Sequence, residues 1–251
     1  MARTLLITGA ASDVGVELLK NIYSDYTEIF LQYRNVNEAL LKVVNGIKED
    51  SKPPHITLLQ SDFEDEARVD AMINAIEQTR HIPDHIIHLP APRPYNQRFH
   101  KDNWENFDRG WDISVRSIVK ILEKFIPHMS RQKYGRIIFM LTSCTKGSPA
   151  KFQSSYVTVK YALLGLMKSL SVEYADKGIT VNGISPEMMD TKFISDLPEL
   201  LIEQNRASSP LKRNVKLDEI IPIMVYMLSD SGAAMTGENI AITGGIIRHS
   251  G

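Results

Sequence analysis

The chain has 251 residues, 43% of them hydrophobic and 24% charged, with a formal net charge of −1. These values are typical of a globular protein with a large core, and they give no broad attraction to nucleic acid or to a membrane surface. The single cysteine, Cys144, excludes an internal disulfide and no apolar run is long enough to cross a bilayer, so the sequence predicts a cytoplasmic protein without nucleic-acid or membrane partners.

Short apolar, β-branched runs alternate with amphipathic stretches along the chain. Strands are predicted at 4–9, 28–34, 55–63, 84–90, 135–143, 178–186 and 238–245, and helices at 14–26, 35–50, 64–80, 106–129, 155–177 and 217–230. Because the strands lack a polar face and nearly all are followed by a helix, the pattern predicts a single α/β domain over residues 1–251. We expect a doubly wound parallel sheet of about seven strands with helices on both faces.

Two stretches, 91–103 and 187–214, interrupt this alternation. Both follow predicted strands, and ligands bind beyond the carboxyl ends of strands in doubly wound sheets. The second stretch is predicted to be a substrate lid, because connections of this length are uncommon without a function. The first could border a site or be an ordinary surface loop. Its Arg93, Arg98 and Lys101 could meet an acidic substrate or a carrier protein, although a basic loop is more often simply solvated.

The segment "TGAASDVG", residues 8–15, lies between the first predicted strand and the first helix. A glycine-rich turn in this position directs backbone N–H groups at a pyrophosphate. Gly9 would permit the tight turn, and Gly15 would permit close packing of the helix on the sheet. Asp13 stands where such loops usually have their middle glycine, and it could cap the helix that begins near Val14. The alternative is a turn that uses glycine for geometry alone.

Tyr156 and Lys160 occupy positions i and i+4 in "YVTVK", at the start of a predicted helix. This spacing places both side chains on one face, where an ammonium group would lower the pKa of the phenol and allow it to exchange a proton with a substrate oxygen. Ser143 ends the preceding strand, at the same edge of the sheet, and could hydrogen-bond that oxygen. The alternatives are a solvated pair on the helix and a strand-end cap.

These features together resemble the short-chain dehydrogenase/reductase family over almost the whole chain. The resemblance rests on "TGAASDVG", Asp62 in "QSDF", Ser143, "YVTVK", "VNGISP" and "MLSDSGAAMTGENIAITGG". The C-terminal part is most similar to bacterial 3-oxoacyl-carrier-protein reductases. The family resemblance implies a Rossmann fold that binds NAD(H) or NADP(H) and no metal. It also implies hydride transfer between nicotinamide C4 and a ketone or carbinol carbon. The substrate would be a small carbonyl or hydroxy compound, with attachment to a carrier as one possibility.

The resemblance also implies roles for individual residues. Tyr156 would be the acid/base, Lys160 would lower its pKa and hold the nicotinamide ribose, and Ser143 would orient the carbonyl. Asp62 and Phe63 would lie at the adenine. The other residues expected at the cofactor are Gly9, Ser12, Asp13, Val14, Gly15, Tyr33, Arg34, Pro90, Pro186, Met189 and Thr191, the last at the nicotinamide or the pyrophosphate.

Four departures from the family pattern are expected to border the same cleft. Asp13 replaces a glycine, "HLPA" at 88–91 replaces an asparagine-containing motif, Ser114 replaces an active-site asparagine that helps to hold a relay water, and Glu187 replaces a glycine. Ser114 could keep that water or break the relay. His88 could be a new acid or base, or a packed histidine, which is the commoner case. The departures leave open a catalytically impaired member that binds nucleotide or acts as an assembly subunit.

The residues after the second predicted strand bear on the choice of cofactor. NAD enzymes usually carry a carboxylate there for the ribose 2′-hydroxyl, whereas this chain has Tyr33 and Arg34. Arg34 could pair with a 2′-phosphate, so NADP(H) is favoured over NAD(H), although Ser12 supplies no second basic group and Arg34 could be merely solvated. The family implies a homotetramer or homodimer, and the apolar run at 161–170 would serve that interface or the core.

Overall fold

The computed structural model describes residues 3–94, 96–149 and 151–246. Within them, seven strands form one parallel sheet in the order β3-β2-β1-β4-β5-β6-β7. The strands are β1 (Thr4–Thr8), β2 (Glu28–Tyr33), β3 (His55–Gln60), β4 (His85–His88), β5 (Gly135–Met140), β6 (Ile179–Pro186) and β7 (Asn239–Ile242). The helices are α1 (Asp13–Ile22), α2 (Glu38–Lys48), α3 (Glu66–Gln78), α4 (Trp104–Trp111), α5 (Ser117–Gln132), α6 (Ser154–Glu173), α7 (Glu199–Ser208) and α8 (Ile221–Leu228). The predicted doubly wound α/β fold is confirmed.

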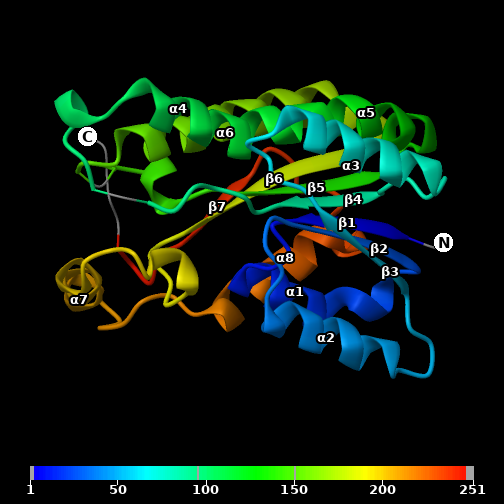
Figure 1. The fold of residues 1–251 in the computed structure, drawn as a ribbon, viewed down its shortest axis with the longest axis horizontal. Coiled ribbons are helices and arrows are strands. Elements are labelled where there is room, and N and C mark those ends of the chain that lie inside the picture. Colours follow the sequence, from blue (N-terminus) through cyan, green and yellow to red (C-terminus); the bar gives the residue numbers. More distant parts are fainter. Residues whose placement is uncertain (1–2, 95, 150, 247–251) are drawn as a thin grey trace.

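The helices form a layer on each face of the sheet (Figure 1). Helices α3, α4, α5 and α6 cover one face, and α1, α2 and α8 cover the other. Two separate clusters of buried apolar side chains fill the space between these layers and the sheet. Strands β1, β4, β5 and β6 are buried throughout, which explains why they are rich in apolar residues and show no polar face. The strand order reverses between β1 and β4, and this switch point is where ligands bind in such sheets.

The long helix predicted at 106–129 is interrupted in the structure. Helix α4 ends at Trp111, a π-helical turn spans Asp112–Arg116, and α5 begins at Ser117. The π-turn coincides with a contact to the sheet, since His88 Nε2 donates a hydrogen bond to the Ser114 carbonyl oxygen at 2.9 Å. The sequence pattern did not indicate this interruption.

Gly15 is required where α1 packs on the chain that leaves β1. A Cβ atom at Gly15 would lie 2.7 Å from the Ala10 carbonyl oxygen, which is backbone and cannot move freely. We therefore expect Gly15→Ala to lower the free energy of unfolding by about 1–3 kcal/mol. Gly46, in α2, has nothing within 4 Å of its added Cβ, so Gly46→Ala should instead raise it by about 0.5–1 kcal/mol. Urea denaturation of both variants measures this, and equal effects would show that the contact at Ala10 is unimportant.

Candidate active site

Two adjoining cavities lie at the carboxyl ends of the strands. The first has a volume of about 410 Å³ and contains Ser143, Tyr156 and Lys160 in its lining. The second, of about 490 Å³, lies over the ends of β1, β2, β3 and β4. Ala91 and Arg93 line both, so the two cavities meet at the loop that follows β4. Together they provide a continuous space of the size that a dinucleotide and a small substrate need.

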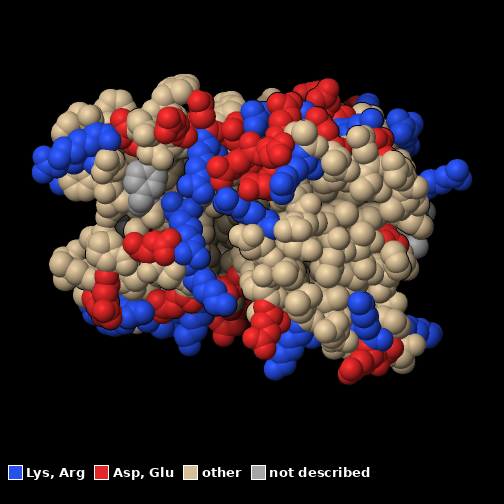
Figure 2. Space-filling model, in the orientation of Figure 1, with Lys and Arg blue, Asp and Glu red and all other residues tan. Residues whose placement is uncertain are grey.

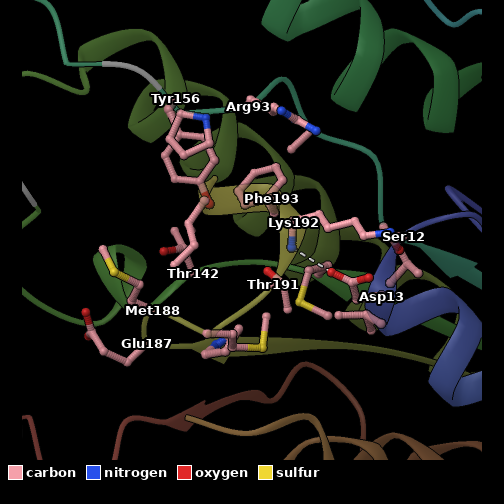
Figure 3. A pocket seen from close by; sticks show the side chains of 18 of the residues that line it. Ser12, Asp13, Arg93, Thr142, Tyr156, Glu187, Met188, Thr191, Lys192 and Phe193 are labelled. Atoms are coloured by element: carbon pink, nitrogen blue, oxygen red, sulfur yellow. Dashed lines mark hydrogen bonds between the residues drawn. The ribbon is translucent and has the colours of Figure 1, made fainter. Parts of the chain in front are cut away.

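Three of the four residues predicted to be catalytic, all but Ser114, lie together in the first cavity. Tyr156 and Lys160 occupy the beginning of α6, one turn apart. Ser143 begins a short 3₁₀ turn, Ser143–Thr145, that follows β5. Lys160 Nζ lies 5.7 Å from the centre of the Tyr156 ring. The Tyr156 ring projects into the cavity beside Phe193 (Figure 3), with 6.4 Å between the two ring centres.

Lys160 is almost completely buried, with 1% of its surface exposed. Its ammonium nitrogen donates a hydrogen bond of 2.6 Å to the Met140 carbonyl oxygen at the end of β5. Burial lowers the pKa of Lys160 to about 7, because the charged amine loses its hydration. The amine can therefore gain or release a proton near neutral pH, which an exposed lysine cannot.

Tyr156 is partly buried, and its side chain is hydrogen-bonded to that of Thr142. Burial raises the pKa of the Tyr156 phenol, and its electrostatic interactions with Cys144 and Glu187 act in the same direction. The sequence predicted a pKa lowered by Lys160, and for this structure that expectation is wrong. Desolvation dominates, while the Lys160 amine lies over the ring and is bound to a main-chain carbonyl.

The glycine-rich loop has the geometry of an anion-binding turn. Gly9 adopts a φ of +70°, and Ser12 is the N-cap of α1, its hydroxyl accepting from Gly15 N–H at 3.1 Å. The proposed capping by Asp13 is therefore wrong. Asp13 Oδ2 instead accepts a hydrogen bond of 2.7 Å from the Lys192 backbone N–H (Figure 3). Its carboxylate is thus directed at the 187–214 segment, which leaves the start of α1 accessible.

Most predicted cofactor residues line one of the two cavities. Ser12, Asp13, Val14, Pro186, Met189 and Thr191 line the first, and Gly9, Arg34, Asp62, Phe63 and Pro90 line the second. Gly15, Tyr33 and Ser114 are outside both linings. Gly15 and Ser114 are buried, and Tyr33 packs against the core on the α1 side of the sheet. The sequence thus identified the edge of the sheet correctly but not the direction of every side chain.

Three of the residues that depart from the family pattern, His88, Ser114 and Glu187, are buried in the structure. His88 is completely buried, and besides its bond to Ser114 it accepts a hydrogen bond from Thr8 Oγ1 at its Nδ1 atom, at 2.9 Å. Burial lowers its pKa to about 3, so the ring is neutral and packed, as the commoner interpretation predicted. Ser114 Oγ is buried without a hydrogen-bond partner among the described residues. Glu187 lines the first cavity and is 7% exposed.

The 187–214 segment lies over the first cavity, and among the described residues two polar contacts bind it to the rest of the cleft. One is the hydrogen bond from Lys192 to Asp13. The other is an ion pair in which Arg93 Nη1 lies 2.7 Å from both carboxylate oxygens of Asp196. Residues between these points, including Phe193 and Ile194, line the cavity. The segment also contains helix α7.

The sequence patterns did not identify several residues that hold or line the cleft. Gln32 accepts from Gly9 N–H at 2.8 Å, and Asn37 donates to the Ala11 carbonyl at 2.6 Å, so both hold the glycine-rich loop. Thr142 contacts Tyr156, and Arg109 lines the second cavity. None belongs to a recognisable motif, and each reaches the site through contacts between elements distant in sequence.

In the part of the chain that the structure describes, no three His, Cys, Asp or Glu side chains are grouped as metal ligands would be. A separate search of the same residues finds no helix with the length and apolar character needed to span a membrane.

Comparisons with known proteins identify relatives along the whole chain. A family model described as enoyl-(acyl carrier protein) reductase matches residues 9–247. The 3-oxoacyl-[acyl-carrier-protein] reductase FabG of Staphylococcus aureus is 26% identical over 249 residues, covering 98% of each chain. The acetoacetyl-CoA reductase of an Acinetobacter species is 24% identical over 262 residues, again covering 98% of each.

Solved structures share the fold. Levodione reductase superposes with a TM-score of 0.86 at 23% identity, covering 97% of this chain and 96% of that one. A 3-oxoacyl-[acyl-carrier protein] reductase with bound NAD from Brucella melitensis gives 0.82 at 20% identity, covering 98% and 91%. The chain belongs to the short-chain dehydrogenase/reductase family of oxidoreductases, which use nicotinamide cofactors.

Proposed function

We propose that the protein is an NADP(H)-dependent reductase that interconverts a ketone and a secondary alcohol, with a 3-oxoacyl thioester as the substrate class. The observation that carries the proposal is the meeting of Ser143, Tyr156 and Lys160 in one cavity at the switch point of the sheet. The substrate class is taken from the names of the relatives, which act on 3-oxoacyl or acetoacetyl groups.

The residues at the cleft fit a dinucleotide. Ser12 and Val14, at the start of α1, line the first cavity, and the Asp13 carboxylate is directed at Lys192, so the start of α1 can face a pyrophosphate. We assign the pyrophosphate to the loop around Ser12 and Val14. The wider set assigned to the cofactor comprises Thr191, Pro186 and Met189 at the nicotinamide end, and Gly9, Arg34, Asp62, Phe63 and Pro90 at the adenosine end.

When bound, the nicotinamide ring supplies the hydride that reduces the carbonyl carbon. Ser143 would donate a hydrogen bond to the carbonyl oxygen and orient it. Because burial raises the pKa of Tyr156, this phenol is protonated at neutral pH, which is the form that gives a proton to the developing alkoxide. Lys160, whose pKa is about 7, would then return a proton to the phenolate that remains.

Segment 187–214 is proposed as the lid of this cleft. Support comes from its position over the first cavity and from its two attachments, Lys192 to Asp13 and Asp196 to Arg93. Both attachments are polar and lie at the surface, where such contacts contribute little to stability. The Arg93 ion pair lowers the pKa of Asp196.

We also propose a homotetramer or homodimer. Support comes from large apolar side chains left exposed on the helical layer that contains α4, α5 and α6: Trp104, Trp111, Val119 and Tyr161. Trp104 is 73% exposed and stacks on Phe107. Light scattering coupled to gel filtration measures the assembly, and a monomer at micromolar concentration would reject it.

The activity is tested by titrating the protein with NADPH and then following its oxidation with acetoacetyl thioesters and a panel of simple ketones. We expect cofactor binding and turnover of at least one 3-oxo compound, with NADH less effective. Binding of NADPH without turnover of any ketone would instead favour an impaired member that serves as a nucleotide-binding or assembly subunit, the outcome that Ser114 and Glu187 leave open.

A further inference from the structure

Three arginines line the second cavity, and they are engaged in different ways. Figure 2 shows a band of Lys and Arg side chains across this face of the molecule, with acidic residues on either side. Arg93 belongs to the lid contact, because it is paired with both carboxylate oxygens of Asp196. Arg34 and Arg109 come from different elements yet share a single carboxylate, that of Glu64.

The shared contact has a defined geometry. Glu64 Oε1 accepts from Arg34 Nη1 at 3.1 Å and from Arg109 Nε at 3.0 Å. Arg34 Nε also lies 3.0 Å from Asp62 Oδ2. The position of Glu64 Oε1 is within hydrogen-bond distance of both guanidinium groups, so an anion placed there could bind both arginines. Guanidinium groups bind phosphate oxygens with the same planar arrangement of donors that they use for carboxylates.

The position of this pair along the fold indicates which anion it would meet. In sheets of this type, the residue that follows β2 lies beside the 2′ position of the adenosine ribose. Arg34 is that residue, and Arg109, from α4, reaches the same point. The Glu64 side chain is 34% exposed and its ion pairs lie at the surface, where such pairs contribute little to stability. It can therefore turn into solvent when a stronger anion arrives.

We propose that Arg109 acts with Arg34 to bind the 2′-phosphate of NADP(H), and that Glu64 occupies the phosphate position until the cofactor replaces it. This inference rests on the cofactor proposed above, and it adds a specificity-determining residue on α4 that no sequence motif indicates. The negative charge of Glu64 would oppose phosphate binding, so removal of this charge would favour it.

The test compares adenosine 2′,5′-bisphosphate with adenosine 5′-monophosphate, which differ only in the 2′-phosphate, by calorimetry at low salt. The wild type should prefer the bisphosphate. Arg109→Gln should lower its affinity for the bisphosphate by about 10- to 100-fold and leave the monophosphate unchanged. Glu64→Gln should raise the bisphosphate affinity by roughly 3-fold or more. Arg68→Gln is the matched control. Arg68 lies on α3, forms an ion pair with Asp65 and is outside the lining of the second cavity.

The opposite signs expected for the two variants separate a ligand contact from general damage to the fold. Equal losses for both nucleotides in Arg109→Gln, an unchanged preference, or weaker bisphosphate binding in Glu64→Gln would overturn the proposal. If the wild type reduces ketones with NADPH while Arg109→Gln keeps the wild-type preference, this inference alone fails. If the wild type binds neither nucleotide, the assigned cofactor site fails with it.

Discussion

Replacing Tyr156 with phenylalanine is expected to lower kcat/KM for ketone reduction by about 10²- to 10⁴-fold, the usual contribution of a positioned acid. The change removes one hydroxyl group, which in the structure is bonded to Thr142 and faces the first cavity. The aromatic contact with Phe193 remains, so the cavity keeps its shape. Steady-state kinetics with the ketone concentration varied from below to above KM measures the loss, and NADPH fluorescence should report unchanged cofactor affinity.

Tyr161→Phe provides the control on the same helix. Tyr161 is 45% exposed and lies outside the lining of either cavity, so removal of its hydroxyl should leave the rate within about 2-fold of the wild type. If Tyr156→Phe reduced ketones at the wild-type rate, Tyr156 would not be the acid. Another group that lines the cavity, such as Glu187, would then have to supply the proton.

Lys160→Met is expected to abolish most activity and yet to stabilise the fold. Burial of Lys160 lowers its pKa from 10.5 in the unfolded chain to about 7, so below pH 7 its charge costs on the order of 5 kcal/mol on folding. Methionine removes this cost but leaves the Met140 carbonyl without its donor, a loss of about 1–3 kcal/mol. We expect a net gain of roughly 1–3 kcal/mol at pH 7.

The pH dependence of stability distinguishes this cause from simple repacking. Between pH 7 and 10.5 the unfolded chain binds more protons at Lys160 than the folded chain does, so this residue makes the wild type more stable as the pH rises. The slope should be smaller in Lys160→Met and unchanged in Lys168→Met, an exposed position on the same helix. Identical slopes in all three proteins, measured by urea denaturation, would contradict a buried amine of lowered pKa.

Those features of this protein that arise from neighbouring residues could be predicted from the sequence. The apolar β-branched runs and their alternation with helices predicted the parallel sheet, because a strand buried on both faces has no polar side. Tyr156 and Lys160 were predicted to share a helical face, since a spacing of four residues places them one turn apart whatever surrounds the helix. Gly9 and Gly15 likewise marked a turn whose demands are local.

Tertiary structure alone decided how these parts meet. Asp13 was expected to cap its own helix but bonds to Lys192, and Arg109 meets Arg34 at Glu64 because α4 and the ends of β2 and β3 converge on one cavity. The Lys160 pKa depends on how completely neighbouring elements exclude water, which the amino-acid types on either side of it cannot reveal. Hydrophobic periodicity indicates which face of a helix or strand is buried. Which side chains meet across the cleft is determined only when the helices and strands pack together.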